Sequence, residues 1–392
     1  MTIKNSLLLA GVTTICAGAW CDAAAQSNVT IYGTVDTALV YSSNQKGPSN
    51  IYLRTGNLAA SKLGFKGNED LGGGTQALFL LENGFDTNTG ALSSPGVLFN
   101  RQAYVGLSNT NYGTLTAGRQ YTPYYLFVGP VGPTSVLTGA TGAHPGDIDG
   151  LDTTIRSSNS LTYTSPIWSG AQFSALVGLG EVAGQPSSGS TLSAAFKYDY
   201  SAWNFALGYQ RLKNGPTPGI WNPGASASFS TSPINNGYVS ADSVQYIAAA
   251  ARYTIGKLGF GINATNVAYR PNNGSLFRNT AIFNSAGLLA TYQLTPAVFV
   301  SAGYSYTREN AANGITDPAK YQQLSLEQTY SFFKRTAFYL LEAYQFAKGT
   351  TLGAAGTGNQ VSAVAVVGDS QNGSPSSGRN QTVLMAGLRH SF

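Results

Sequence analysis

Large apolar residues alternate with small or polar residues over several segments of this chain. In residues 203–209 the odd positions are Trp, Phe, Leu and Tyr, and the even positions are Asn, Ala and Gly. Residues 298–306 repeat the pattern, with Ser301, Gly303 and Ser305 between apolar or aromatic positions. Successive side chains of a β-strand point to opposite faces of a sheet, so this period of two predicts strands with one apolar face.

We predict sixteen strands from this pattern. Many have about the 9–11 residues with which a tilted strand crosses a bilayer, and an even number is typical of single-chain bacterial barrels. Beyond the first residues no run of about 18 apolar residues occurs, so no transmembrane helix is expected. The pattern favours an all-β fold, a transmembrane antiparallel β-barrel. The predicted strands are 29–40, 58–68, 75–84, 100–108, 113–119, 159–165, 170–180, 190–199, 203–211, 244–254, 258–269, 285–293, 298–308, 321–331, 336–346 and 381–392.

The connections between these strands alternate between short and long. Outer-membrane barrels have short periplasmic turns and longer external loops, whereas a soluble β-sandwich has no reason to sort its connections by end. We therefore predict that the long connections lie together at the external end. The short connections are 69–74, 109–112, 166–169, 200–202, 256–257, 294–297 and 332–335, and the long ones are 41–57, 85–99, 120–158, 181–189, 212–243, 270–284, 309–320 and 347–380.

The two faces of the predicted strands differ in a way that suits a water-filled barrel. The weakly polar face consists of small residues, where a soluble protein would expose many Lys and Glu. We predict that it lines a lumen without a packed core, since barrels of about 16–18 strands enclose an aqueous channel. Aromatic residues near the short turns predict a girdle at the periplasmic interface: Trp168, Tyr198, Tyr200, Trp203, Tyr253, Tyr292, Phe332, Phe333 and Phe392.

Composition indicates an exported protein. Charged residues are only 10% of the 392 residues, against about 25% in ordinary soluble domains. Lys4, the apolar run 7–15 and the small residues 23–25 predict an export signal in 1–25, followed by a single barrel domain, 26–392. Both cysteines, Cys16 and Cys21, precede the predicted cut, so the mature chain is not expected to form disulfides or thiolate metal sites.

Five sequence blocks are spread from one end of the mature chain to the other. They are 29–33 (VTIYG), 61–72 (SKLGFKGNEDLG), 100–107 (NRQAYVGL), 113–120 (GTLTAGRQ) and 387–392 (GLRHSF). Together they resemble the trimeric porins of Gram-negative bacteria, and most closely the beta-proteobacterial branch. The resemblance implies a 16-stranded barrel in the outer membrane, three barrels per assembly and a third loop folded inside each pore.

The resemblance also implies a constriction in which basic residues of the wall face acidic residues of the third loop. Matched by motif, the basic residues are Lys62, Arg101, Arg119 and Arg156. The third loop, 120–155, contributes the acidic residues Asp147, Asp149 and Asp152. The family's Pro-Glu-Phe-Gly-Gly core is replaced here by Gly-Asp-Ile-Asp-Gly, so the carboxylate that reaches the lumen stays open. Strand parity also leaves open the side to which Arg101 points.

Other chemistry has little support in the sequence. The run 147–150 could belong to a calcium loop, but the full ligand series and the distal Glu of an EF-hand are absent. His144 and His390 are the two histidines, and a Ser–His lipase site or an Asp–His protease site on the barrel would need one of them. We expect no enzyme, no cofactor and no metal. No stripe of basic and aromatic residues indicates nucleic-acid binding.

We predict an outer-membrane channel for passive diffusion of ions and small hydrophilic solutes. The net charge of +5 and the basic wall residues predict a mild preference for anions, because rings of Arg and Lys favour them. A channel of the same fold selective for anions or organic acids, and a non-conducting adhesin or receptor, are the alternatives. Expected partners are two further copies, outer-membrane lipid and lipopolysaccharide, and the barrel insertion machinery, for which the terminal Phe392 is a typical signal.

Overall fold

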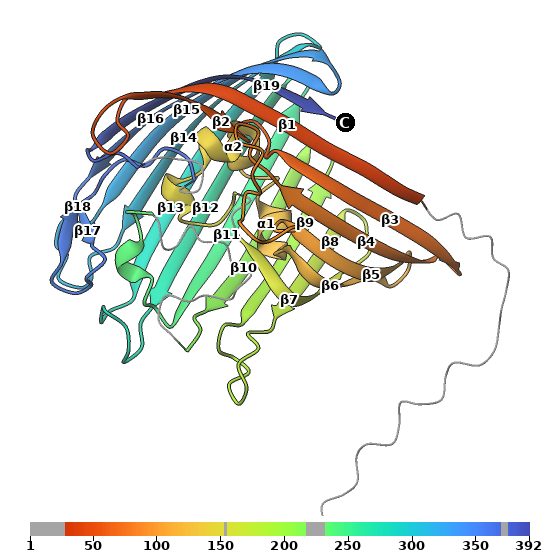
Figure 1. Cartoon of the computed structure of the whole chain (residues 1–392), viewed down its shortest axis with the longest axis horizontal. Coiled ribbons are helices and arrows are strands. Elements are labelled where there is room, and N and C mark those ends of the chain that lie inside the picture. Colours follow the sequence, from red (N-terminus) through yellow and green to blue (C-terminus); the bar gives the residue numbers. More distant parts are fainter. Residues whose placement is uncertain (1–27, 153–154, 217–231, 370–374) are drawn as a thin grey trace, which may run out of the picture.

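The protein is a closed antiparallel β-barrel. The computed structural model describes residues 28–152, 155–216, 232–369 and 375–392, so the predicted export signal, 1–25, lies outside the described residues. Most wall strands pair with their neighbours in sequence, and β19 (Asn380–Ser391) returns to pair with β1 (Asn28–Ser42). Figure 1 shows the tilted strands side by side in the wall of the barrel.

Seventeen strands occupy sixteen positions of this wall, because β2 and β3 lie end to end beside β1. β2 (Asn50–Thr55) pairs with the second half of β1, and β3 (Lys62–Gly72) pairs with its first half. The predicted 16-stranded barrel is thereby confirmed. The other wall strands are β4 (Thr75–Gly84), β5 (Gln102–Asn109), β6 (Gly113–Tyr121), β7 (Arg156–Thr164), β8 (Ala171–Gly178), β9 (Thr191–Tyr200), β10 (Trp203–Lys213), β11 (Ser243–Ile255), β12 (Leu258–Arg270), β13 (Ala281–Gln293), β14 (Val298–Glu309), β15 (Lys320–Phe333) and β16 (Thr336–Lys348).

The first long connection differs from its prediction. Residues 41–57 were expected to be a loop, but 50–55 form β2, with Ile51 and Leu53 exposed on the outer face. The predicted strand 58–68 begins only at Lys62, and residues 56–61 leave the wall between β2 and β3. Six residues of alternation are too few to distinguish a strand from a loop in the sequence. The segment is a strand because it pairs with β1, and this pairing is a tertiary contact.

The described connections sort by length as predicted. Those between β3 and β4, β5 and β6, and so on to β15 and β16 have two to six residues. The connections at the other strand ends are longer, up to the third loop, 122–155. The long connection after β16 contains a small hairpin of β17 (Thr350–Leu352) and β18 (Gln360–Ser362), which the sequence pattern did not indicate.

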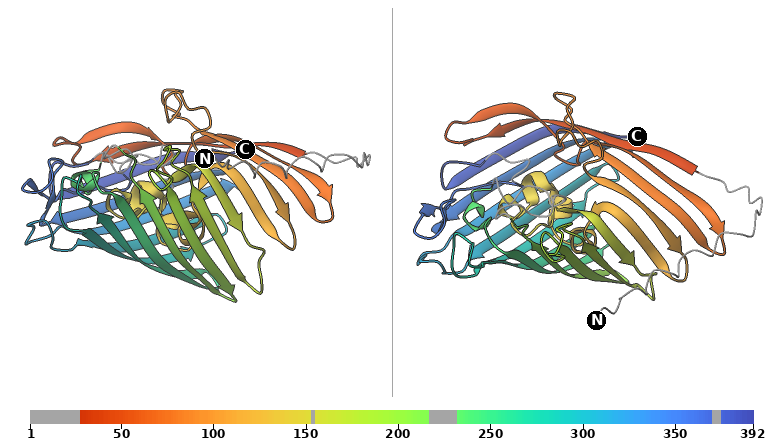
Figure 2. Two further views of the ribbon diagram at one scale, coloured as in Figure 1. Left: turned by 90° about the horizontal axis from the view of Figure 1, so that it is seen from below. Right: turned by 60° about the horizontal axis from the view of Figure 1, so that its bottom comes forward.

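The third loop folds into the barrel, as predicted. Its helix α1 (Pro123–Val128) lies against β9 and β10, and α2 (Thr134–Gly142) lies against β14, β15 and β16. Figures 1 and 2 agree in placing both helices within the ring of strands. Among the described residues, no helix has the length and apolar character needed to cross a membrane.

The interior corrects the prediction of a lumen without a packed core. A cluster of buried apolar side chains joins the third loop and other external connections to the inner faces of β10–β13, and it includes Tyr124, Val128, Tyr246, Tyr269 and Phe283. Small wall residues make this possible. A Cβ at Gly208 would lie 2.8 Å from Val128 and 2.9 Å from Tyr124, and one at Gly303 would collide with Leu137. The small inward side chains therefore leave room for the loop as well as for water.

Gly208→Val is expected to push α1 away from the wall. The new side chain would meet Tyr124, which is fully buried and held by a hydrogen bond from its N–H to Ser193 Oγ (3.0 Å). Overpacking of this kind costs about 1–3 kcal/mol, and the displaced helix should change the single-channel conductance. Gly261→Val is the control, because a Cβ there meets only a wall residue, Leu289, at 3.3 Å. Unchanged conductance in folded Gly208→Val would contradict this account.

The outer face carries the predicted aromatic girdle beside the short turns. Trp203 follows the turn 201–202, and its ring lies 4.6 Å from that of Tyr253 and 5.4 Å from that of Phe205, centroid to centroid. Aromatic rings of this kind settle at the membrane interface. Trp203, Trp168, Tyr200 and Phe332 are all exposed on the protein surface.

Trp203→Asp is expected to lower the yield of folded barrel. The substitution removes two ring contacts and places a charge on the membrane-facing surface, with an expected loss of about 1–3 kcal/mol. Heat-modifiable migration on gels after refolding into detergent or lipid measures the folded fraction. Trp203→Phe, which keeps an aromatic ring, should fold almost normally, and a normal yield of the Asp variant would refute the assignment of Trp203 to the girdle.

Candidate functional site

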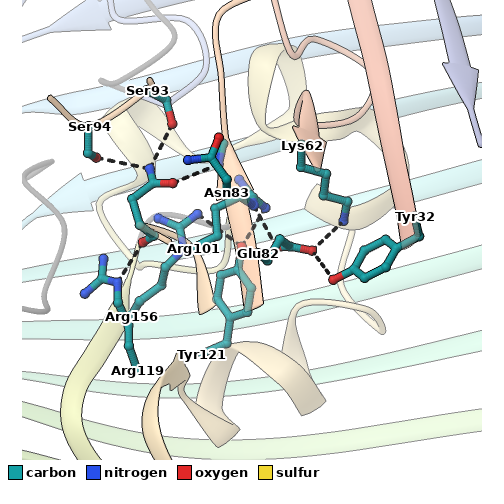
Figure 3. A network of polar contacts seen from close by, with 12 residues as sticks. Tyr32, Lys62, Glu82, Asn83, Ser93, Ser94, Arg101, Arg119, Tyr121 and Arg156 are labelled. Atoms are coloured by element: carbon teal, nitrogen blue, oxygen red, sulfur yellow. Dashed lines mark hydrogen bonds and ion pairs between the residues drawn. The ribbon is translucent and has the colours of Figure 1, made fainter. Parts of the chain in front are cut away.

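A group of polar side chains gathers on the inner wall where β1, β3 and β4 pair. Tyr32, Gly64 and Glu82 stand directly opposite one another in the register of these strands, so they share the inner face. Gly64 has no side chain, and the Tyr32 ring occupies the space that a Cβ would need. The Tyr32 hydroxyl thereby reaches across β3 and donates a hydrogen bond to Glu82 Oε2 at 2.9 Å (Figure 3).

Glu82 is the centre of this group. Its carboxylate is buried, lies 3.5 Å from Lys62 Nζ, and accepts a hydrogen bond from Arg101 Nε at 2.8 Å. Sequence reasoning missed Glu82, because residues 77–81 are a continuous apolar run without the alternation that assigns faces. Lys62 and Arg101, two of the basic residues predicted for the wall, are therefore partly neutralised by a carboxylate of the same wall.

Two arginines flank the ring of Tyr121 at the end of β6. Arg101 Nη2 and Arg156 Nη2 both donate to the Tyr121 hydroxyl, at 2.6 and 3.1 Å. Their guanidinium carbons lie 5.9 and 4.9 Å from the centre of the Tyr121 ring, within the range of cation–π attraction. Arg101 is only 7% exposed and Arg156 only 6%. We call Lys62, Glu82, Arg101, Tyr121 and Arg156 the wall network (Figure 3).

Arg101 reaches the inner side although its parity matches outward residues of β5. It lies just before β5 begins at Gln102, at a bend where its N–H donates to Glu82 O at 3.2 Å. Gly84 leaves the space that the Arg101 side chain crosses, since a Cβ there would lie 3.2 Å from Arg101 Cδ. The predicted strand 100–108 included Arg101, but β5 begins one residue later, and strand parity does not apply to a residue outside the paired strand.

Lys62 is the member of the wall network that reaches water. Its side chain is 31% exposed, whereas the Glu82 side chain is 4% exposed. The network holds three cations and one carboxylate. Charges in a narrow aqueous passage between low-dielectric walls act over a longer range than in bulk water. The wall therefore presents net positive charge to the passage, with Lys62 at its surface.

Arg119 comes from the other face of β6 than the wall network, and it interacts electrostatically with Arg156 and Tyr121. It pairs with Ala103 in the register, on the face where Val105 and Leu107 are exposed outward. Its Nε donates to the carbonyl of Asn100 at 2.7 Å, and its Nη1 donates to Ser158 Oγ at 3.0 Å. The structure thus brings together Lys62, Arg101 and Arg156, and Arg119 lies beside this group (Figure 3).

Asp149 of the third loop is turned to the opposite wall. Its carboxylate is fully buried, bonds to the His144 ring, and accepts a hydrogen bond from Thr265 of β12 at 3.0 Å. Burial alone would raise the pKa of Asp149, but the charge of the His144 ring and the hydrogen bonds from His144 and Thr265 hold it below its usual value. This carboxylate fastens the loop to the wall.

Asp152 is the third-loop carboxylate with access to water. Asp147 is buried, and its Oδ1 accepts a hydrogen bond from the N–H of Asp152 at 3.0 Å. Asp152 itself is half-buried and lies against Gly139 of α2, where a Cβ would collide with the carboxylate. Arg54 of β2 interacts electrostatically with Asp369 and Asp152. Sequence reasoning missed Arg54, because the alternation in the six residues of β2 is too short to predict a strand.

Cation-binding chemistry finds no support in this part of the loop. Asp147 and Asp149 bond to separate groups of the protein, and no cluster of three metal-ligating side chains occurs among the described residues. His390, the second histidine, bonds to Thr336 Oγ1 at 2.9 Å across the β16–β19 pair.

These features define a class: a membrane-spanning β-barrel whose interior is narrowed by a folded loop opposite a charged wall. The chain belongs to the Gram-negative porin family, whose profile matches residues 10–356, and it is an outer-membrane protein. It is 28% identical to outer membrane porin protein 32 of Delftia acidovorans over 94% of this chain and 95% of that protein.

Two further comparisons agree with this family. The chain is 34% identical to an outer membrane porin protein of Bordetella pertussis, over 44% of this chain and 47% of that protein. An anion-selective porin from Comamonas acidovorans has the same fold, with a TM-score of 0.70 and 24% identity over 94% of this chain and 100% of that one. The predicted beta-proteobacterial porin resemblance is confirmed.

Proposed function

We propose that this porin is a passive channel for ions and small hydrophilic solutes, with a mild preference for anions. The observation behind this proposal is the wall network, which holds three cations and one carboxylate. Lys62 and Arg101 pair with Glu82, Arg156 bonds to Tyr121, and Lys62 faces water. Asp152 is the proposed acidic group on the side of the third loop. The anion selectivity of the Comamonas porin is consistent with this assignment.

General diffusion is favoured over selective binding of one solute. A lumen lined by accessible Arg and aromatic side chains would favour a substrate-selective channel. Arg101 and Arg156 do flank an aromatic ring, but both are buried and bonded to Tyr121, and Arg101 is also bonded to Glu82. Buried side chains that are already hydrogen-bonded contribute to the local electric field in the passage, but they do not offer free groups to bind a solute.

The assembly and the route into the membrane are also proposed from the family. We propose a homotrimer in contact with outer-membrane lipid and lipopolysaccharide. We further propose that Phe392 is part of the signal for the insertion machinery. Its backbone already closes the barrel, because Gly33 and Phe392 exchange N–H···O hydrogen bonds of 3.1 and 3.0 Å.

Planar-bilayer recording tests the proposal. The purified protein should give large, stable conductance steps that occur in groups of three, and a zero-current potential in a KCl gradient that indicates mild anion preference. A cation preference would mean that Asp152 and other carboxylates outweigh the wall network. A folded protein that does not conduct would contradict the channel and favour an adhesin or receptor.

A further inference from the structure

Three buried glutamines stand side by side on the inner wall. Gln323 of β15, Gln345 of β16 and Gln381 of β19 are directly opposite one another in the register of the three strands. All three are almost completely excluded from solvent. Gln345 Nε2 donates to Gln323 Oε1 at 2.7 Å. We call these three residues the glutamine ladder.

Gln323, the first residue of the glutamine ladder, binds the third loop. Gln323 Nε2 donates to the carbonyl of Thr141 at 2.8 Å and to that of Ala143 at 3.1 Å. Ser325, also on β15, bonds to the same Thr141 carbonyl. These carbonyls belong to the end of α2, where no following helical turn can bond to them. The wall therefore supplies the partners that the end of this helix needs.

The other two residues of the ladder, Gln345 and Gln381, bind residues 363–369 of the long connection after β16. We call residues 363–369 the inner strap. Gln345 binds the backbone of one residue twice: Val366 N–H donates to its Oε1 at 2.6 Å, and its Nε2 donates to Val366 O at 2.8 Å. Gln381 Oε1 accepts from Val367 N–H at 2.8 Å, and its Nε2 donates to Asn44 O at 2.8 Å.

The inner strap and the third loop also touch each other directly. Gly146 N–H donates to Gly368 O at 3.0 Å, and Asp369 N–H donates to Gly139 O at 3.0 Å. Ala365 of the strap is fully buried. The strap therefore lies in contact with the loop that narrows the barrel, and the two are fixed to three neighbouring strands: the loop to β15, the strap to β16 and β19.

We propose that the glutamine ladder is a positioning device that joins the inner strap to the third loop, so that the two segments set the pore as one unit. An amide side chain suits this role because it offers both donors and an acceptor to a buried peptide group. Gln345 is the central residue, since it bonds to the strap and to Gln323 at once. The proposal rests on the proposed channel function only where it predicts a current.

Thiol labelling of the strap tests the ladder without measuring current. Cys16 and Cys21, the two cysteines of the chain, lie in the predicted export signal, so Ala365→Cys places a single thiol in the mature protein. This thiol should react slowly with a small methanethiosulfonate reagent in the otherwise native barrel. Adding Gln345→Leu leaves the N–H and C=O of Val366 without the bonds to Gln345. The rate at which the Ala365→Cys thiol is labelled should then rise by about tenfold or more.

Gln210→Leu is the matched control for this labelling. Gln210 is an equally buried, inward glutamine of β10, and neither of its side-chain polar atoms bonds to any described residue. Labelling of the Ala365→Cys thiol should be unchanged in this background. Fast labelling in the native barrel, no acceleration with Gln345→Leu, or equal acceleration by both glutamine variants would each overturn the proposal.

Two further measurements keep the proposal testable. If Gln345→Leu does not fold, Gln381→Leu removes the bond to Val367 of the strap, together with the bond to Asn44, and leaves both bonds to Val366 in place. It should still speed labelling of the Ala365→Cys thiol, though less, and no acceleration there refutes the ladder. In single-channel recordings, Gln345→Leu should raise open-channel current noise, whereas Gln210→Leu should not. Faster labelling without added noise would retain the ladder as an anchor and refute its role in setting the pore.

Discussion

Lys62→Glu is expected to turn the proposed anion preference of the channel into a cation preference. Lys62 is the water-exposed cation of the wall network, and the other two cations are buried beside Tyr121. The substitution leaves two cations and two carboxylates on this wall, with Asp152 on the side of the loop. The passage then faces a small excess of negative charge, and the row in excess sets ion preference.

The zero-current potential in a KCl gradient measures this change directly. Lys257→Glu is the control, because it makes the same change in net charge at the short turn between β11 and β12, away from the wall network. We expect its potential to stay close to that of the native channel. A persistent anion preference in Lys62→Glu, or an equal shift in both variants, would refute the assignment of ion preference to the wall network.

Asp36→Ala is expected to be the most destabilising single substitution proposed for this barrel. The buried Asp36 carboxylate accepts hydrogen bonds from the N–H groups of Asn57, Leu58 and Ala59, at 2.9–3.0 Å. The Tyr339 hydroxyl donates a fourth bond at 2.6 Å. Removal of the carboxylate leaves these donors buried without a partner, at a cost on the order of 3–5 kcal/mol.

The effect should extend to the pore, because the segment held by Asp36 ends where Lys62 begins β3. Urea unfolding in lipid vesicles, followed by tryptophan fluorescence, measures the stability, and single-channel recording measures the conductance. Asp36→Asn keeps one acceptor oxygen and should lose less stability. Thr34→Ala, also inward on β1, removes a single hydroxyl contact with Ser391 and serves as control. Equal losses in all three variants would argue against the special role of Asp36.

The strands could be predicted because the alternation of apolar and polar residues in each segment distinguishes its two faces. Residues 203–209 and 298–306 alternate strictly, and both form wall strands, β10 and β14, with the predicted faces turned to the membrane and to the interior. Alternation is a local property, because the position of a residue along its own strand decides whether its side chain faces lipid or the barrel interior. The sorting of the connections by length then fixed the order and direction of the strands.

The candidate site was only partly accessible to this reasoning. The family resemblance points to Lys62, Arg101 and Arg156, which the structure brings to one wall. Glu82 escaped because its strand does not alternate, and the pairing Tyr32–Gly64–Glu82 is visible only in the register of three strands. The carboxylates of the third loop share one short run of sequence, yet Asp149 bonds to the wall while Asp152 reaches water.

By itself, the sequence determined that this chain forms a barrel of sixteen wall positions, with a long third loop and a basic set of wall residues. Only the tertiary structure decided what fills the interior. The small inward residues Gly208 and Gly303 suit a water-lined wall and a docked loop equally well, because a missing side chain does not say what takes its place. The neighbours of such positions come from segments far away in the chain, and these contacts exist only once the barrel has closed.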